Sequence, residues 1–325
     1  MDHAVEDDDF DGDIFIYRGG LAPLHVTHAR IDESVDEIED DALKHCEDLV
    51  HVETHDGIRR VGKMAFYRCK SLRQINLNSA VEIDRGAFHC CENLESVELG
   101  DRLETIGSTL FFQCKSLSHI KLSSIITIGA SAFFSCKRLT DIEFSERLQT
   151  MGINAFHSCV CLRRIAIPLI RDLFDFHYFY HKYTQFDECE QLTTVDIVGG
   201  THKAVASLHM DSWRAEMISE INRINQVLPN TPADDKTGVI RQWMHSVMDK
   251  MDHYKAEHYR YVKEGTTLLE LALWKAKQLD EKEESSGERQ TKKAKVDNRS
   301  ARKERRITCG ADTVIKNVLP FLKLV

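Results

Sequence analysis

The sequence predicts an α/β solenoid, a stack of about seven short repeats, followed by a small α-helical C-terminal domain. The first observation is a ladder of regularly spaced cysteines, in which only the last step is clearly longer than the others. Its members are Cys46, Cys69, Cys91, Cys114, Cys136, Cys159 and Cys189. The second observation is a change to helical periodicity after residue 200, where the repeat stops.

Each repeat contains a short run in which apolar residues alternate with polar ones. A leucine stands three residues after each ladder cysteine, a β-branched residue six after, and an apolar residue eight after in all copies but the first. Period-two alternation places the last two side chains on one face of a strand. The inward β-branched positions are Val52, Ile75, Val97, Ile120, Ile142, Ile165 and Val195. Because one repeat cannot bury its apolar face alone, we expect the copies to stack.

The segment Ala-Phe-x-x-Cys predicts a helical or 3₁₀ turn on the opposite wall. Phenylalanine, or Leu43 in the first copy, occurs three residues before each ladder cysteine and usually follows alanine. We expect the small alanine to let neighbouring backbones approach while the ring fills the space between the walls. Gly62, Gly107, Gly129 and Gly152 are predicted to mark a corner, because glycine adopts backbone conformations that are costly for other residues.

The full pattern, Ile-Gly-x-x-Ala-Phe-x-x-Cys-x-x-Leu-x-x-Ile-x-Leu, resembles the BspA-like class of leucine-rich repeats. The clearest copies run from Ile128 to Phe144 and from Met151 to Ile167, and the resemblance covers roughly residues 38–197. It implies a leucine-rich-repeat binding scaffold with varied partners, and it implies no substrate or reaction.

Two departures from the pattern are informative. The first copy has Thr54 at its last apolar position, as expected of a terminal repeat. The long step before Cys189 contains an aromatic insert, residues 174–183. We interpret this insert either as rings packed over the end of the stack or as a protruding binding loop.

Residues 201–279 are predicted to be helical. A first helix presents one apolar face, made by Trp213, Met217, Ile221, Ile224 and Leu228. A second helix is predicted from Ile240 and ends before Gly265, and a capping box at Thr267-x-x-Glu270 predicts a third. We expect the apolar faces to pack together and cap the solenoid, with the docking of a separate partner helix as the alternative.

Composition sets the remaining boundaries. Residues 1–12 are acidic and predicted to be disordered, 13–37 form an N-terminal lead-in or cap, and 38–200 contain the solenoid. Residues 280–306 form a charged linker without periodicity, for which we expect disorder. Residues 307–325 are apolar again and are predicted to pack on the helical region. This end, with the last predicted helix, resembles the tail that accompanies BspA-like repeats in some algal proteins.

The second half of the linker is strongly basic and resembles a bipartite nuclear-import signal. Its candidate residues are Lys292, Lys293, Lys295, Arg302, Lys303, Arg305 and Arg306. Short basic clusters are common, so a plain solvated linker is the alternative. The stretch lacks the interleaved aromatic residues that stack on nucleic-acid bases.

The overall charge argues against nucleic acid as a partner, because the net charge is −9. The first residues lack the basic and apolar regions of a secretory signal, and no apolar run approaches the roughly 20 residues needed to span a bilayer. We therefore expect an intracellular protein, cytoplasmic or nuclear, that has no membrane partner and keeps its cysteines as thiols.

Neither cysteines nor histidines form a recognisable catalytic or metal motif. Cys90–Cys91 and Cys159-x-Cys161 have the wrong spacing for a structural zinc site. No Gly-x-Ser-x-Gly, His-Glu-x-x-His or phosphate-binding loop occurs. We expect no metal, no cofactor and no enzymatic activity. The histidines are expected to be solvated, with His89 and His157 on the outer wall and His51 and His119 on the strand face.

The candidate partner-binding face consists of the residues that flank each inward β-branched position. These are His51, Glu53, Gln74, Asn76, Ser96, Glu98, His119, Lys121, Asp141, Glu143, Arg164, Thr194 and Asp196. They would form two mostly polar, slightly acidic columns roughly 30 Å long at the usual strand spacing. Solvated strand faces are polar in any case, but extended solenoid surfaces commonly bind partners.

We therefore predict a non-catalytic protein–protein interaction scaffold that binds one or more proteins. The rival class is a substrate-recognition subunit of a ubiquitin ligase or of another enzyme complex. An adaptor helix such as an F-box would distinguish the two classes, and none is identified in the sequence.

Overall fold

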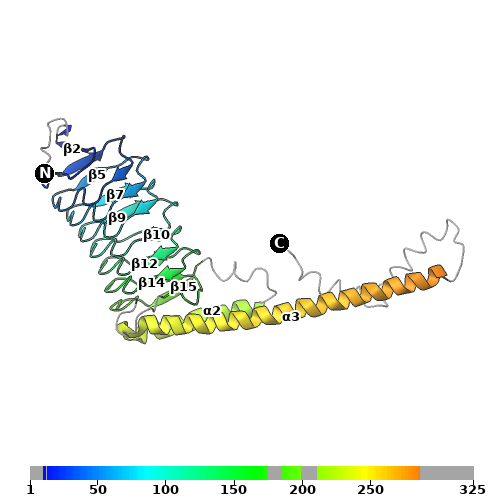
Figure 1. Ribbon diagram of the computed structural model, residues 1–325. Helices are drawn as coiled ribbons and strands as arrows, with labels where there is room; N and C mark the ends of the chain where they lie inside the picture. The colour runs from blue at the N-terminus through cyan, green and yellow to red at the C-terminus, as the bar shows by residue number, and fades with distance from the viewer. Residues whose placement is uncertain (1–9, 12, 175–184, 199–210, 286–325) are drawn as a thin grey trace. The chain divides into compact units, whose positions relative to one another are not determined.

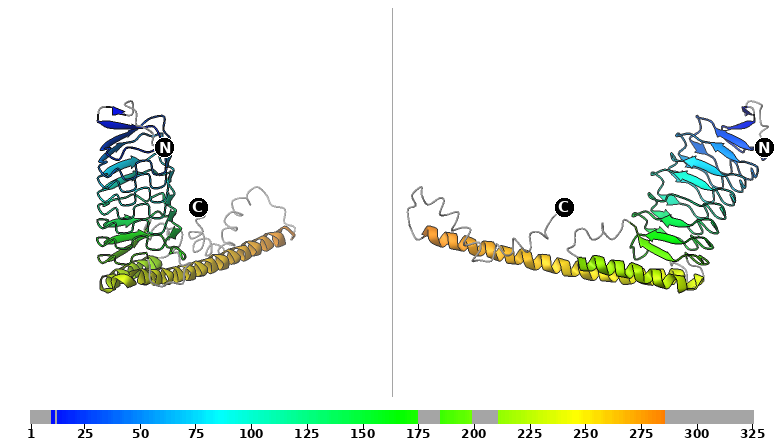
Figure 2. Two further views of the ribbon diagram at one scale, coloured as in Figure 1. Left: turned by 60° about the vertical axis from the view of Figure 1, so that its left-hand side comes forward. Right: turned by 180° about the vertical axis from the view of Figure 1, so that it is seen from behind.

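The computed structural model describes residues 10–11, 13–174, 185–198 and 211–285 (Figure 1). The chain divides into two compact units, and the first, Met1–Thr201 with Glu216–Met248, contains the whole repeat stack. Figure 2 shows the stack from two other directions, with strands following one another along one wall. The predicted solenoid is confirmed.

The main wall is a ladder of strands that pair in parallel at equivalent positions of successive repeats, except for β1 at its start, which is antiparallel. Its first sheet joins β1 (Phe10–Asp11), β2 (Ile14–Tyr17), β3 (His28–Ile31), β5 (His51–Glu53), β7 (Gln74–Leu77) and β9 (Ser96–Leu99). Its second sheet joins β12 (Asp141–Glu143), β14 (Arg164–Ile167) and β15 (Thr194–Ile197). Ile75 lies opposite Val97, and Ile165 lies opposite Val195, which confirms the inward register.

A second wall carries two-residue strands, one from each repeat. One sheet contains β4 (Glu37–Ile38), β6 (Arg60–Val61) and β8 (Glu82–Ile83), and another contains β10 (Thr105–Ile106), β11 (Thr127–Ile128) and β13 (Thr150–Met151). In each of these two-residue strands, the second residue is buried and the first is exposed or partly exposed. The Ile or Val of the Ile-Gly pair is the last residue of such a strand, and the glycine follows directly after it.

The expected ladder of seven strands is interrupted at its fourth member. Between β9 and β12 only single bridges form, from Ser96 to His119 and from Leu122 to Phe144. Ile120, predicted to point inward, is partly exposed. Because a buried inward residue is what fixes strand register in the other repeats, its loss here agrees with the weak pairing on both sides.

The predicted core is confirmed and is organised in columns. Phe66, Phe88, Phe111, Phe133 and Phe156 are fully buried, and their rings stack along the axis with neighbouring centroids 4.9–5.7 Å apart. The seven ladder cysteines are also buried and free. Each thiol donates a hydrogen bond to a carbonyl oxygen of the preceding repeat, at sulfur–oxygen distances of 3.0–3.5 Å. The cysteine is therefore both a small apolar residue and a hydrogen-bond donor between repeats.

Thiol labelling of the native protein should leave the ladder cysteines unmodified. Burial raises the pKa of all seven, to about 11 at Cys46 and about 12 at Cys189, and well above the usual value in the five between. Because the thiolate is the reactive species, a maleimide reagent should modify them only after denaturation. Cys90 and Cys161 are partly exposed and serve as internal positive controls. Fast native labelling of Cys114 and Cys136, followed by mass spectrometry, would contradict the assignment.

The reason given above for the corner glycines is wrong. Gly129 and Gly152 do not have positive φ angles. A Cβ atom at either position would instead lie 2.5 Å from a backbone nitrogen of the preceding repeat, that of Ser108 or Ala130. Glycine is required here because two backbones approach closely.

Left-handed backbone occurs at two other positions of each repeat, mostly at residues that are not glycine. The position before the ladder cysteine has φ between 57° and 64° at His45, Arg68, Cys90, Gln113, Ser135, Ser158 and Glu188. This conformation is costly for non-glycine residues. It aims the backbone N–H at the next repeat, as in the bonds from Arg68 to His89 and from Ser135 to His157, 2.9 and 2.8 Å long. Hydrogen bonds between repeats offset the strain.

The helical region differs from the prediction in its number of helices. The first helix, α2 (Asp211–Val227), is present and is followed by a short 3₁₀ helix, η2 (Leu228–Asn230). After a second 3₁₀ turn, η3 (Ala233–Asp235), a single helix of 50 residues follows, α3 (Lys236–Ser285). The predicted break at Gly265 and the capping box at Thr267 are therefore wrong. One glycine costs a helix interior only about 1 kcal/mol, and the Thr267 hydroxyl donates 2.8 Å to the carbonyl of Lys263 within the helix.

The predicted packing holds only for the first part of these helices. Met217, Ile224, Ile240, Met244 and Val247 are buried in the unit that contains the stack. The residues of the expected third helix are half exposed: Leu268, Leu271, Leu273 and Trp274. Because α3 does not break at Gly265, no turn brings them back onto the preceding part of the helix.

Two disorder boundaries also require correction. Phe10–Asp11, inside the segment expected to be disordered, form β1 and pair antiparallel with β2, which satisfies their backbone groups. Residues 280–285, expected to be linker, continue α3 to Ser285. The rest of 286–306 and the segment 307–325 lie outside the described residues, as do residues 175–184, which contain most of the aromatic insert.

Candidate functional site

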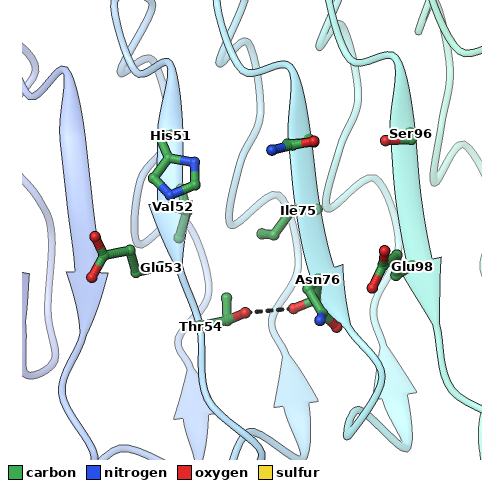
Figure 3. Close-up of a pocket in the computed structure, with 9 residues that line it drawn as sticks. His51, Val52, Glu53, Thr54, Ile75, Asn76, Ser96 and Glu98 are labelled. Carbon is green, nitrogen blue, oxygen red and sulfur yellow. Dashed lines mark hydrogen bonds between the residues drawn. The ribbon is translucent and has the colours of Figure 1, made fainter.

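The candidate face contains a groove over β5, β7 and β9. It has a volume of about 470 Å³, and its lining residues are His51, Val52, Glu53, Thr54, Gln74, Ile75, Asn76, Ser96 and Glu98. Figure 3 shows these side chains on three neighbouring strands, with the Thr54 hydroxyl directed at Asn76. That hydroxyl donates to the Asn76 carbonyl oxygen at 2.6 Å, which gives the polar residue of the first repeat a partner. The first six residues of the predicted face therefore meet in one concave surface.

The rest of the predicted face continues along the ladder without forming part of this groove. His119, Lys121, Asp141 and Glu143 are exposed, and Arg164, Thr194 and Asp196 are partly exposed. Ala166, which flanks Ile165, is buried. Because pairing is broken at His119, the residues from Asp141 onward belong to a separate sheet.

Sequence reasoning missed two members of this surface, His28 and Arg30 on β3. Their strand pairs in register with β5, so His28 lies opposite His51, with ring centroids 6.5 Å apart. The sequence contains a further copy of the repeat, one period before the first copy that was recognised. Val26, Ala29 and Ile31 stand at its leucine and inward positions and are all buried. The copy was overlooked because proline, not cysteine, stands at residue 23.

The charges of the face are partly compensated by ion pairs between repeats. Arg30 pairs with Glu53, with 2.5 Å between Nε and Oε2, and Arg164 pairs with Asp196 at 2.8 Å. Lys121 pairs with Asp101 at 3.2 Å, with both side chains largely exposed. Among the described residues, Glu98, Asp141 and Glu143 of the predicted face are the carboxylates for which no cationic partner is found. The uncompensated charge of the face is therefore negative.

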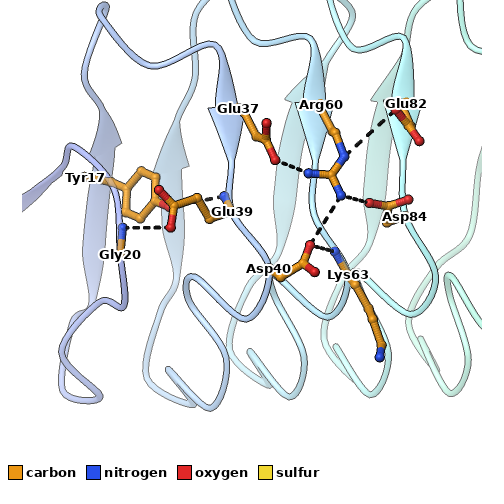
Figure 4. A network of polar contacts seen from close by, with 9 residues as sticks. All are labelled: Tyr17, Gly20, Glu37, Glu39, Asp40, Arg60, Lys63, Glu82 and Asp84. Carbon is orange, nitrogen blue, oxygen red and sulfur yellow. Dashed lines mark hydrogen bonds and ion pairs between the residues drawn. The ribbon is translucent and has the colours of Figure 1, made fainter. Parts of the chain in front are cut away.

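A second polar cluster lies on the other wall, around Arg60 of β6 (Figure 4). Its guanidinium group contacts four carboxylates of the two neighbouring repeats, Glu37 and Asp40 on one side and Glu82 and Asp84 on the other. These acids stack at neighbouring positions of the solenoid, where their charges would repel one another without the arginine. The cluster therefore links the first repeats electrostatically.

The expectation that His89 and His157 are solvated is wrong. Both belong to a column of rings on the outer wall, with neighbouring centroids 4.6–5.2 Å apart: Tyr67, His89, Phe112, Phe134 and His157. The rings from His89 to His157 are stacked, and Tyr67 is tilted against His89. The side chain of His157 is only 15% exposed. Flat rings at equivalent positions of repeats spaced about 5 Å apart stack face to face, which removes much of their surface from water.

The ring column makes stability dependent on pH. Burial, with smaller effects of Arg68 and Arg85, lowers the pKa of His89 below its usual value near 6.5. As the pH falls below that value the unfolded chain takes up the proton first, so the stability present at neutral pH is lost as the pH falls through the folded-state pKa. His89→Phe should therefore reduce the loss of stability between about pH 7.5 and about pH 5 in urea unfolding. His25→Phe, at an exposed position, is the control, and equal pH dependence in both variants would contradict the prediction.

No group of three or more metal-ligating side chains occurs in the part of the chain that the structure describes. In that same part, no helix combines the length and the apolar character needed to cross a membrane. The candidate import residues, Lys292 to Arg306, lie outside the described residues.

Comparison with known proteins identifies the repeat. A family model described as BspA type leucine rich repeat region matches in six copies over residues 22–127 and 78–185, together about half of the chain. No curated protein matches the sequence.

Two bacterial proteins of solved structure are similar to the chain. A leucine rich cell surface protein from Faecalibacterium prausnitzii A2-165 is 25% identical, with a TM-score of 0.43, over 52% of this chain and 54% of that one. A leucine rich repeat protein of T. pallidum is 23% identical, with a TM-score of 0.46, over 64% of this chain and 97% of that one. The chain therefore spans about half the length of the first of these proteins.

Proposed function

Since this chain belongs to the BspA-type leucine-rich repeat family, we propose that it is a non-catalytic scaffold that binds another protein across the strand face of its solenoid. Leucine-rich repeat proteins generally mediate binding, and an extended repeat surface suits a macromolecular partner. The observation that carries the proposal is the groove over β5, β7 and β9, because it combines a concave shape with several exposed hydrogen-bonding side chains.

The chemistry of the face supports a partner segment with hydrogen-bond donors and positive charge. Glu98 lies at the edge of the groove, and Asp141 and Glu143 continue the same face. All three are exposed carboxylates. Complementary charge would speed the encounter and select the partner, while contacts inside the groove would supply most of the affinity.

The proposal is tested by reversing charge in the groove and measuring the binding of a captured partner. Proximity labelling first identifies candidate proteins, and the affinity of each purified candidate is then measured by titration. Gln74→Arg with Glu98→Arg should weaken binding at least tenfold, because both side chains are exposed in the groove. The matched control is Asp48→Arg with Gln149→Arg, which changes the net charge equally at exposed positions outside the groove.

Equal affinity of the groove variant, the control and the unmodified protein for every candidate would reject the strand face as the binding surface. Recovery of a ubiquitin-ligase core component whose binding the groove variant leaves unchanged would favour the alternative, a substrate-recognition subunit. Such a subunit needs a second contact surface in addition to the groove.

We also propose an intracellular location, supported by seven buried cysteines that remain free thiols. If the basic stretch acts in nuclear import, replacing Lys292, Lys293, Arg305 and Arg306 by alanine should move a fluorescently tagged protein from nucleus to cytoplasm. The thermal unfolding midpoint should not change. An unchanged distribution would leave the stretch as a solvated linker.

A further inference from the structure

The distal part of α3 carries a band of large apolar side chains that are about half exposed to solvent. Leu268, Leu271, Leu273 and Trp274 are 55%, 51%, 50% and 59% exposed. Together they surround the helix within two turns (the orange-yellow part of α3 in Figure 1). An apolar surface that encircles a helix is typical of a helix buried on several sides, so this band indicates a contact that completes the fold or an interface.

Two small residues mark the side from which a second segment approaches. Gly265 and Ala272 are buried, Ala272 with only 4% of its surface exposed. They are seven residues apart, which places them on the same face of the helix two turns apart. Small side chains on one face allow another backbone to approach closely, while the large residues of the band flank it.

A second copy of this helix fits the band poorly. The apolar period of α3 passes through Tyr254, Tyr261 and Leu268 at steps of seven, as in a coiled-coil seam. The next step of seven reaches Lys275, and Gly265 lies on the same seam. Two copies would therefore bury two lysine charges and leave space at two glycines, both of which weaken a coiled coil.

We propose that the C-terminal segment of the same chain, residues 307–325, docks on the apolar band of α3. The segment supplies the chemistry that the band requires, with nine large apolar residues: Ile307, Val314, Ile315, Val318, Leu319, Phe321, Leu322, Leu324 and Val325. It carries only Asp312, Lys316 and Lys323 as charged side chains. Association would remove apolar surface of both partners from water.

The length of the connecting chain agrees with this contact. From Ser285 back to Leu268 the helix measures about 26 Å, at 1.5 Å per residue. Residues 286–306 span at most about 70 Å when fully extended. The connection is therefore long enough for the segment to return along the helix and reach the whole band. Val296 is the only large apolar residue of this connection, which therefore has little apolar surface to compete for the band.

Hydrogen exchange of the full chain tests the proposal. Val318→Ser, Leu319→Ser and Phe321→Ser together should increase amide exchange of residues 261–275 at least tenfold, because the cover of the band is lost. The matched control places three serines in the connection, at Asp297, Asn298 and Arg299, and should leave exchange unchanged. Exchange of residues 128–144 in the solenoid should be unaltered in both variants, which separates loss of docking from general unfolding.

A reciprocal variant distinguishes the occupants. Leu271→Asp should increase exchange of residues 307–325 at least tenfold at every protein concentration if the contact is within one chain. Unchanged exchange of 307–325 in this variant, or of 261–275 in the triple variant, would overturn the proposal. Protection of the band that disappears on dilution, together with a dimer in sedimentation, would assign the band to a second copy and overturn it equally.

Discussion

Phe133→Ala is expected to lower the free energy of unfolding by about 3–5 kcal/mol, the usual cost of removing a fully buried ring. Phe133 has no exposed surface, and its ring stacks between Phe111 and Phe156 at centroid distances of 5.4 and 4.9 Å. The loss would leave a cavity between repeats that backbone hydrogen bonds hold at a fixed spacing, so the neighbouring rings cannot fully close it. Unfolding in urea, followed by circular dichroism, measures the change.

The matched control is the adjacent residue of the same type. Phe134 stacks between Phe112 and His157 in the outer column at 4.7 Å on both sides, but it is only partly buried. Phe134→Ala should therefore cost less than Phe133→Ala, about 1–2 kcal/mol, because less surface returns to water. A change below about 1 kcal/mol for Phe133→Ala would mean that this ring is not part of the core.

The second large effect is expected at Lys236, the first residue of α3. Its side chain is buried, with 2% exposure, and its ammonium group donates hydrogen bonds to the carbonyl oxygens of Cys189, Glu190 and Leu192 at 3.0, 2.7 and 2.8 Å. Burial lowers the pKa of this lysine, but three acceptors satisfy its three donors. The ammonium group thus bonds carbonyl oxygens of the last repeat, to which no further repeat donates hydrogen bonds.

Lys236→Met should lower the free energy of unfolding by about 3 kcal/mol, because three buried acceptors lose their donor and each unsatisfied group costs about 1–3 kcal/mol before relaxation. Lys255→Met, at an exposed position of the same helix, should change stability by less than about 0.5 kcal/mol. Urea unfolding of both variants gives the comparison. Equal stability of the two variants would show that water replaces the ammonium group at the end of the stack.

Other contacts at this end have the same function as Lys236. Asn225 of α2 accepts a hydrogen bond from the backbone N–H of Val195 at 2.8 Å, and Thr237 accepts one from that of Phe186 at 2.9 Å. The Trp243 indole donates to the Glu220 carbonyl at 3.1 Å, which joins α3 to α2. The start of the helical region therefore completes the backbone hydrogen bonds of the last repeat, as solenoid ends require.

The sequence by itself determined the repeat unit, its register and its core. Because each copy has the same inward positions at a regular period, the spacing along the chain predicts which residues of successive repeats are neighbours in space. Phe133 and Cys136 could therefore be assigned to the interior from spacing alone, and the structure places both there. The polar residues beside Ile75 and Val97 were assigned to the outer surface on the same reasoning, and they line the groove.

Only the tertiary structure decided which residues are constrained or buried by contacts between parts of the chain that are distant in sequence. The clash that requires glycine at position 129 arises from the backbone of the preceding repeat, and the burial of His157 arises from Phe134 on the repeat before it. The burial of Lys236 depends on carbonyls of the last repeat, which lie far from it along the chain. Propensity marked Gly265 as a helix end, yet its cost is smaller than the gain from a continuous helix. Such effects depend on distances in space, and a pattern along the chain does not contain them.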